Sequence, residues 1–310
     1  MNKQDLRIIY MGTPEFAVPS LEVLIQDGWN VVAVITAPDK PKGRGQKLIP
    51  SPVKETAVKH NIPVLQPTNL KSPEFLEELK SYQADIQVVV AFRMLPEAVW
   101  NMPPQGTFNL HASLLPNYRG AAPINWAIIN GEKETGITTF FLKHEIDTGS
   151  IIFQEKEPIT PEDNVGTLYE RLMQKGSKLV LKTIEAVAAG QINPTVQDES
   201  MFKHHAPKIF KETCEIDWNK SSLEIHNLVR GLSPYPAAWT TLEGKNCKIY
   251  KTQIEEEQND KLKPGEFETD GKSHLTFKTG SGKISVLELQ LEGKKRMAIT
   301  DFLRGYQFKN

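Results

Sequence analysis

The first half of the chain alternates between short apolar runs and segments in which apolar residues have a helical spacing. The apolar runs have the length of buried strands, and they cover residues 6–11, 31–35, 86–92, 106–111 and 135–142. Helices are expected between them, for example over residues 53–60 and 73–82. This strand–helix alternation predicts an α/β domain with a Rossmann-like, mostly parallel sheet.

The turn after the first run bears on the choice of cofactor. Gly12 stands where a dinucleotide-binding fold begins its glycine fingerprint, but the chain continues with Thr13-Pro14-Glu15 and has no Gly-x-Gly-x-x-Gly. Thr13 is expected to cap the following helix, with Pro14 at the first helical position. A nicotinamide or flavin cofactor is therefore not expected.

The pattern changes in the second half of the chain. Residues 165–189 have the spacing of a long amphipathic helix, and a stretch containing Pro194 and Pro207 follows as a linker. Beyond it lie one helical segment, over 222–232, and several short strand-like runs. These runs cover residues 215–218, 239–242, 247–251, 273–278 and 283–289. We therefore expect an α/β domain over 1–190, a linker over 191–208 and a small, OB-like β-barrel over 209–310.

Composition narrows the class of protein. The chain has 310 residues and a net charge of −1, which is not the charge of a strongly basic nucleic-acid-binding protein. Its two cysteines, Cys214 and Cys247, do not form a disulfide framework or a zinc motif, so no metal is expected. The sequence shows no signal peptide and no membrane-spanning run. We expect a cytoplasmic monomer without membrane contact.

Three polar side chains follow predicted strands. Asn109 and His111 are two residues apart, so they share one face of their strand, and Asp147 comes shortly after the next strand, in Asp147-Thr-Gly149. An amide can stabilise an oxyanion, an imidazole can exchange protons near neutral pH, and a carboxylate can orient that imidazole. No serine or cysteine is placed as a nucleophile, which favours direct acyl transfer to an amine. A structural histidine and an ordinary Asp-Thr-Gly turn remain open alternatives.

A basic segment over residues 36–54 connects the second strand to a helix. Its cations are Lys40, Lys42, Arg44, Lys47 and Lys54, against one acidic residue, Asp39. The segment is long for a connection in an α/β domain, and such loops are often functional. Contact with a phosphate backbone and a solvated loop without a partner are both compatible with this composition.

These segments together resemble a known family. Asn109-x-His111, Ser113-Leu-Leu-Pro116, Arg119-Gly-Ala-Ala-Pro123 and Asp147-Thr-Gly149 resemble the core of the folate-dependent formyltransferases. Three further stretches resemble the branch of that family whose acceptor is methionyl-tRNA, and they are residues 11–18, residues 38–54, and residues 206–209 with 216–218. The chain departs from the family pattern at Phe92-Arg93 and over residues 142–146, both in segments that line the folate pocket by analogy.

The resemblance implies transfer of the formyl group of 10-formyltetrahydrofolate, as co-substrate, to the α-amine of methionyl-initiator tRNA, without a metal. It implies catalytic roles for Asn109, His111 and Asp147. It implies folate contacts for Phe92, Ser113, Leu114, Leu115, Pro116 and Ile146. It implies tRNA contacts for Lys40, Lys42, Arg44, Lys47 and Lys208.

Two other functions remain in view. A sugar-nucleotide N-formyltransferase would share the core with a different amine, but it would need neither the basic segment nor a tRNA-sized barrel. A catalytically silent RNA-binding protein would have no need for the Asn-His-Asp set. The basic segment and the barrel therefore count against the sugar acceptor, and the Asn-His-Asp set counts against a silent protein.

Overall fold

The computed structural model describes residues 1–42, 47–255 and 261–308. The chain folds into two compact units, each assembled from separate stretches of sequence. The first unit comprises Met1–Gly120, Thr135–Glu157 and Tyr169–His205, and the second comprises Ala121–Glu134, Pro158–Leu168 and Ala206–Asn310. The division into 1–190, 191–208 and 209–310 stays a prediction.

The first unit is built on a seven-stranded sheet in the order β10-β9-β7-β6-β1-β2-β5. Its strands are β1 (Arg7–Gly12), β2 (Asn30–Ile35), β5 (Val64–Leu65), β6 (Ile86–Val90), β7 (Thr107–His111), β9 (Glu134–Phe141) and β10 (Ile151–Pro158). The five strands from β7 to β5 are parallel, and β9 is antiparallel to β7. Every residue of β6 is buried, as expected for a strand covered on both faces. The predicted α/β class is confirmed.

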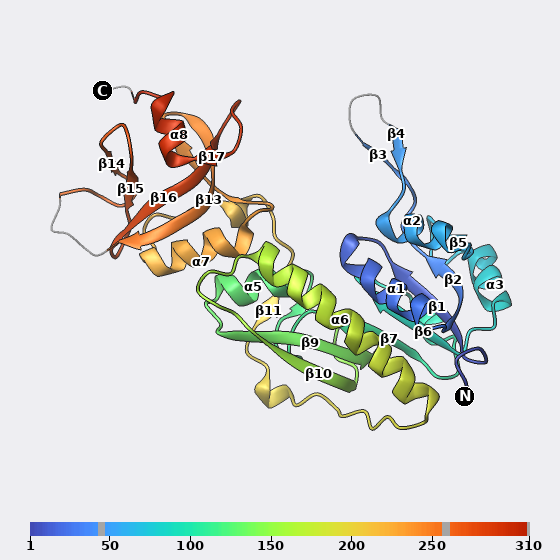
Figure 1. The fold of residues 1–310 in the computed structure, drawn as a ribbon. Coiled ribbons are helices and arrows are strands. Elements are labelled where there is room, and N and C mark those ends of the chain that lie inside the picture. The colour runs from blue at the N-terminus through green and yellow to red at the C-terminus, as the bar shows by residue number, and fades with distance from the viewer. Residues whose placement is uncertain (43–46, 256–260, 309–310) are drawn as a thin grey trace. The chain divides into compact units, whose positions relative to one another are not determined.

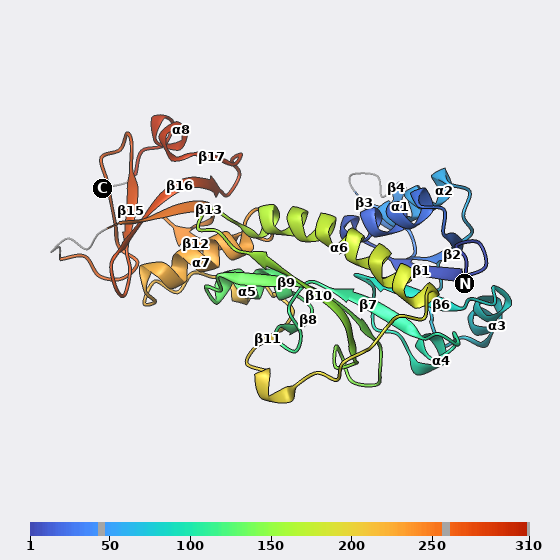
Figure 2. The same cartoon turned by 60° about the horizontal axis from the view of Figure 1, so that its bottom comes forward.

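The helices of this unit are α1 (Val18–Gln26), α2 (Pro52–Lys59), α3 (Pro73–Ser81), α4 (Glu97–Trp100) and, from Tyr169 on, α6 (Val165–Ala188). The chain runs from β1 through β2 to β5 and then returns to β6, on the other side of β1 (Figure 1). Because crossovers between parallel strands are right-handed, this return moves the connecting helices to the opposite face. Figure 2 shows α1 and α2 on one face and α3 and α4 on the other. Such a reversal of strand order leaves a crevice at the carboxyl ends of the strands.

The helix after β1 begins later than the sequence predicts. Pro14 precedes a short 3₁₀ helix, η1 (Glu15–Ala17), and α1 begins at Val18 with Pro19 in its first turn. The prediction of Thr13 as a helix cap is wrong, because its hydroxyl accepts the backbone N–H of Ala37 at 3.4 Å. Proline suits the start of a helix, and this segment uses its two prolines to start two successive helices.

The basic segment forms a two-stranded ribbon. β3 (Lys40–Lys42) pairs with β4 (Lys47–Ile49) in antiparallel register, with Lys40 opposite Ile49. Lys40 is exposed, whereas Lys54 in α2 binds the Asp39 carboxylate at 2.7 Å. Arg44 lies outside the described residues. We call residues 40–49 the basic ribbon.

The second unit contains an antiparallel sheet in the order β12-β13-β16-β15-β14, with β17 paired to β16. Its elements are α5 (Pro123–Ile129), η3 (Glu212–Cys214), α7 (Ser222–Leu232), β12 (Ala238–Leu242), β13 (Lys245–Glu255), β14 (Phe267–Thr269), β15 (Leu275–Lys278), β16 (Lys283–Leu291), β17 (Met297–Ala298) and α8 (Ile299–Arg304). The sheet and α7 enclose an apolar core that includes Ile225, Ile249 and Leu289. This half-barrel confirms the predicted small barrel-like domain.

One predicted strand of this unit does not form. Within residues 215–218, only Glu215 makes a bridge, to Trp239. Trp218 lies flat on Phe277 instead, with 4.3 Å between the ring centroids. An apolar aromatic side chain is needed here to cover the core, and the backbone does not have to be extended for that contact.

Helix α5 belongs to the second unit although it lies in the first half of the sequence. Asn125 Nδ2 donates to the Gly231 carbonyl in α7 at 2.8 Å. A Cβ at Gly231 would lie 2.6 Å from Ile129 Cγ1, so the two helices approach closely. Over the described residues, none of the helices combines the length and apolar character needed to cross a membrane.

Candidate active site

The end of β7 carries two polar side chains on one face. Asn109 and His111 are two residues apart in this strand, so they project to the same side of the sheet. Asn109 is half-buried, and its amide has no hydrogen-bond partner within residues 1–42, 47–255 and 261–308. His111 is 6 % exposed and is the last residue of the strand. The strand therefore presents an available amide beside a buried imidazole.

The two nitrogens of the His111 ring have different surroundings. Nε2 lies 2.8 Å from the Tyr118 carbonyl oxygen. Because a carbonyl oxygen can only accept, Nε2 carries a proton. Nδ1 lies 3.8 Å from Asp147 Oδ2, which is too far for a hydrogen bond and close enough for an ion pair with a charged ring. Nδ1 is thus the nitrogen that remains available for proton exchange.

Asp147 lies in the loop between β9 and β10 and has a left-handed backbone, with φ at +56°. Its Oδ2 accepts the backbone N–H of Gly120 at 2.9 Å. Two residues on, the loop passes so close to β9 that a Cβ at Gly149 would lie 1.6 Å from the Phe141 carbonyl oxygen. The structure thus brings Asp147 to His111 by a loop conformation that requires glycine at position 149.

Gln197, which is outside the predicted set, binds this loop, and Arg119 binds Gln197. Gln197 Nε2 donates to the carbonyl oxygens of Asp147 and Gly149, at 2.7 and 2.9 Å. Arg119 donates to Gln197 Oε1 from Nε and Nη2, at 3.1 and 2.6 Å. The sequence showed Arg119 only as part of a family motif, and Gln197 fell in the expected linker. Nothing in the residues around Gln197 signals its role, which depends on burial.

The six residues predicted to contact folate have different environments. Phe92 and Leu114 are half-buried, Ile146 is 62 % exposed, and Ser113, Leu115 and Pro116 are buried. Ser113 Oγ donates to the Asn117 carbonyl at 2.6 Å, and the Leu115 N–H donates to Thr138 Oγ1 at 3.3 Å. The hydrogen bonds of Ser113 and Leu115 therefore hold the turn that follows His111. Their contact with folate stays a prediction.

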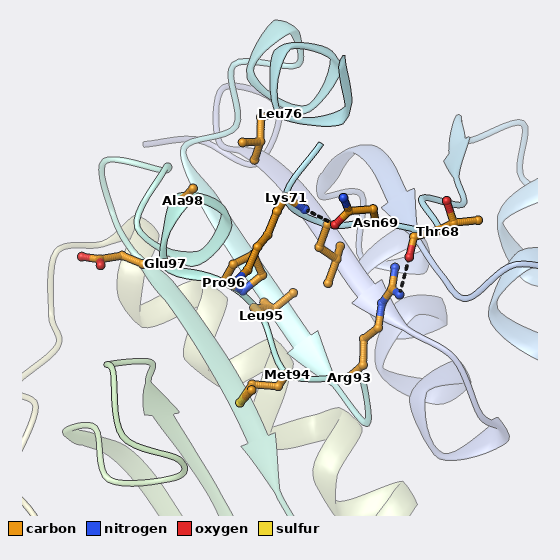
Figure 3. Close-up of a pocket in the computed structure, with 11 residues that line it drawn as sticks. Thr68, Asn69, Lys71, Leu76, Arg93, Met94, Leu95, Pro96, Glu97 and Ala98 are labelled. Carbon is orange, nitrogen blue, oxygen red and sulfur yellow. Dashed lines mark hydrogen bonds between the residues drawn. The ribbon is translucent and has the colours of Figure 1, made fainter. Parts of the chain in front are cut away.

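An open pocket of about 600 Å³ lies where β6 ends. Figure 3 shows its lining, which combines apolar side chains such as Met94 and Leu95 with Lys71 and Glu97. Arg93 closes one side, where its guanidinium donates to the carbonyl oxygens of Pro67 and Thr68. The pocket begins one residue after Phe92, and none of the six predicted folate residues lines it.

The predicted tRNA contacts lie in both units. Lys40, Lys42 and Lys47 belong to the basic ribbon of the first unit, and the backbones of Lys42 and Lys47 pair across it. Lys208, in the second unit, is exposed, and its Nζ lies 5.5 Å from the ring centre of Phe210. In the part of the chain that the structure describes, no group of three His, Cys, Asp or Glu side chains could hold a metal ion.

Comparison with known families identifies the family of the chain. Residues 6–184 match the family model described as formyl transferase, and residues 208–307 match the model described as formyl transferase, C-terminal domain. The chain therefore belongs to the formyl transferase family. Among curated relatives, two proteins named methionyl-tRNA formyltransferase are similar over nearly their whole length. The one from Phocaeicola vulgatus is 58% identical over 99% of this chain and 98% of its own, and the one from Bacteroides fragilis is 53% identical over 99% and 97%.

Solved structures share the fold at lower identity. WlaRD, a sugar 3N-formyltransferase crystallised with dTDP and 5-N-formyl-THF, is 22% identical, with a TM-score of 0.68 over 94% of this chain and 99% of its own. HypX from Aquifex aeolicus in complex with tetrahydrofolic acid is 19% identical, with a TM-score of 0.65 over 96% of this chain and 48% of its own. At these identities the similarity establishes the fold.

We predict that Gly149→Ala destabilises the protein. The new Cβ would collide with a backbone oxygen that cannot move alone, so the loss in unfolding free energy should reach or exceed the ~1–3 kcal/mol of an overpacked site. Thermal unfolding measures it, with Gly305→Ala as control, because a Cβ there meets no atom within 4 Å and the backbone φ is −116°. Equal unfolding temperatures for the two variants would contradict the prediction.

Proposed function

We propose that the chain transfers the formyl group of 10-formyltetrahydrofolate to the α-amino group of methionine on initiator tRNA. The observation that carries the proposal is the set of Asn109, His111 and Asp147 at the carboxyl end of the sheet. The curated relatives, which are more than half identical, support methionyl-tRNA as acceptor through their names. Tetrahydrofolic acid in the HypX structure and 5-N-formyl-THF in the WlaRD structure support the donor.

We propose a role for each of the three side chains, and the geometry supports it. The neutral amine attacks the formyl carbon, and the carbonyl oxygen becomes an oxyanion as the tetrahedral intermediate forms. The Asn109 amide, which has no partner among the described residues, donates a hydrogen bond to that oxygen. When the intermediate collapses, the bond from carbon to N10 breaks and N10 takes a proton.

His111 supplies that proton from Nδ1, because Nε2 is held by the Tyr118 carbonyl. Asp147, 3.8 Å from Nδ1, stabilises the protonated ring as its counter-ion. The amine loses its proton through water to the same pair of residues. No covalent acyl-enzyme is needed, since the attacking group belongs to the acceptor.

We propose further that the pocket at the end of β6 binds part of the folate co-substrate. It is lined by residues that follow β5 and β6, and it begins next to Phe92 of the predicted folate segment. Its apolar lining suits an aromatic group. Lys71 at its rim supplies a cation for the carboxylates that folate carries on its glutamate.

The basic ribbon and Lys208 are the proposed contacts to tRNA phosphates. Lys40 is exposed on the ribbon, and Arg44 belongs to the same segment although it lies outside the described residues. We also propose that the protein acts as a monomer in the cytoplasm, where its acceptor is made and used.

We predict that Asn109→Ala and His111→Asn each lower kcat by about 10²- to 10³-fold, the loss expected for an oxyanion donor and within the range expected for a general acid. The assay measures labelled formyl transfer from 10-formyltetrahydrofolate to methionyl-initiator tRNA, beside an amino-sugar nucleotide. His60→Ala, at an exposed position outside the site, is the control. Near-normal turnover in either variant would remove that residue from the mechanism, and transfer to the sugar alone would overturn the tRNA proposal.

We predict that Lys40→Ala weakens tRNA binding at low salt and reduces the slope of log affinity against log salt concentration by about one. The reason is that one phosphate contact, and the counterion it releases, is lost. Binding of initiator tRNA is measured from low to moderate salt, with Lys59→Ala, an exposed lysine at the end of α2, as control. If the slope is the same in both variants, the ribbon does not contact phosphate.

We predict that Lys71→Ala raises KM for 10-formyltetrahydrofolate by about 1.4- to 5-fold, the effect of losing an exposed ion pair worth about 0.2–1 kcal/mol. KM for tRNA should not change. Lys80→Ala, an exposed lysine in α3, serves as the control. An unchanged KM for folate in Lys71→Ala would show that the pocket binds no anionic part of the donor.

A further inference from the structure

We propose that Gln197 is a positioning residue for the reaction, which holds Asp147 at its place beside His111. The inference rests on the proposed function, because it assigns Asp147 a role in formyl transfer. It goes beyond that function by giving residues 197–204, which the sequence presents as part of a linker, a role in holding the site.

The burial of Gln197 is the first observation. The side chain is 5 % exposed, while residues 193–196 and 198–200 are all exposed. A lone buried amide in an exposed stretch must find hydrogen bonds to compensate for lost contact with water. Gln197 uses its full capacity, with two bonds donated by Nε2 and two accepted by Oε1.

The two acceptors of Gln197 are the second observation. Its Nε2 donates to the carbonyl oxygens of Asp147 and Gly149, on either side of Thr148. Asp147 has a left-handed backbone, which a non-glycine residue keeps only when the surroundings enforce it. The pair of bonds from Gln197 fixes the backbone of this turn, and with it the direction in which the carboxylate leaves the chain.

Arg119 determines how the Gln197 amide is oriented. Its guanidinium binds Gln197 Oε1 and both carboxylate oxygens of Glu199, at 3.0 and 2.7 Å, so only the carbonyl end of the amide can face it. The hydrogen bond from Arg119 lowers the pKa of Glu199 and keeps this carboxylate charged. The amino end of Gln197 is thereby directed to the Asp147 turn. The next residue after Arg119 is Gly120, whose N–H binds the Asp147 carboxylate itself.

The same segment also supports the other partner of His111. The Tyr118 N–H donates to the His204 carbonyl at 2.7 Å, and the two rings are stacked with centroids 5.5 Å apart. Tyr118 in turn offers its carbonyl to His111 Nε2. Residues 197–204 therefore hold both groups that face the imidazole, one through Gln197 and one through His204.

The first experiment compares Gln197→Met, Gln197→Glu and the control Gln191→Met in the full-length protein. Methionine keeps the length of the side chain and removes all four bonds, and glutamate keeps the acceptor but places an oxygen against two carbonyls. Gln191 is an exposed glutamine of the linker predicted over residues 191–208. We expect kcat to fall about 10- to 100-fold in both Gln197 variants, as for a misplaced catalytic group, with KM for folate and tRNA within about 3-fold of wild type. A normal kcat in Gln197→Glu would contradict the proposal.

A double-mutant cycle with Asp147→Asn separates positioning from general support of the fold. If Gln197 acts through the Asp147 carboxylate, Gln197→Met should reduce kcat much less in the Asp147→Asn background than in the wild type. Fully additive losses would mean that Gln197 acts elsewhere, and the proposal would be wrong.

Hydrogen exchange of the segment 145–150, followed by mass spectrometry, tests the same contact without catalysis. We expect faster exchange in Gln197→Met than in Gln191→Met, because the turn loses its two bonds. Unchanged exchange would contradict the proposal. If wild-type protein transfers formyl to no offered acceptor, the proposed function fails, while this measurement still decides whether Gln197 holds the turn.

Discussion

The position of His111 between a carbonyl oxygen and a carboxylate is the constraint on which the site depends. The Tyr118 carbonyl sets which nitrogen carries a proton, and the Asp147 carboxylate faces the other nitrogen. Neither the carbonyl nor the carboxylate belongs to the strand that carries His111. Each is brought by a loop, so the chemistry of one imidazole depends on how firmly two loops are held against the sheet.

The sheet supplies the rigid part of this arrangement. β6 and the carboxyl half of β2 are buried, and β7 continues the same parallel register up to His111. The structure of a sugar 3N-formyltransferase shares this fold over 94% of the chain at 22% identity.

The sequence predicted the elements whose apolar pattern is strong. The strands over 6–11 and 31–35 and the helix over 222–232 agree with β1, β2 and α7 to within a residue. It failed where local rules allow two outcomes, as with Thr13, where either of two prolines could begin the helix. It also failed at Trp218, whose aromatic ring stacks in the core without needing an extended backbone.

The sequence pattern also explains why three of the polar side chains were expected to lie close together. Asn109 and His111 share a strand face, which period-two alternation makes visible, and the approach of Asp147 follows from both strands ending near one edge. Gln197 was missed because its importance lies in contacts with residues about fifty and eighty positions away, at Asp147 and Arg119. A local sequence pattern does not predict hydrogen bonds between residues so far apart in the chain.

The membership of α5 in the second unit has a consequence for synthesis of the chain. Asn125 and Ile129 contact Gly231 in α7, about a hundred residues further on. During translation, α5 therefore leaves the ribosome long before the helix that covers its apolar side. That side stays exposed until α7 has been made, so this unit cannot complete its core from one continuous nascent segment. A fragment starting at residue 206 would lack α5 and leave the matching side of α7 uncovered.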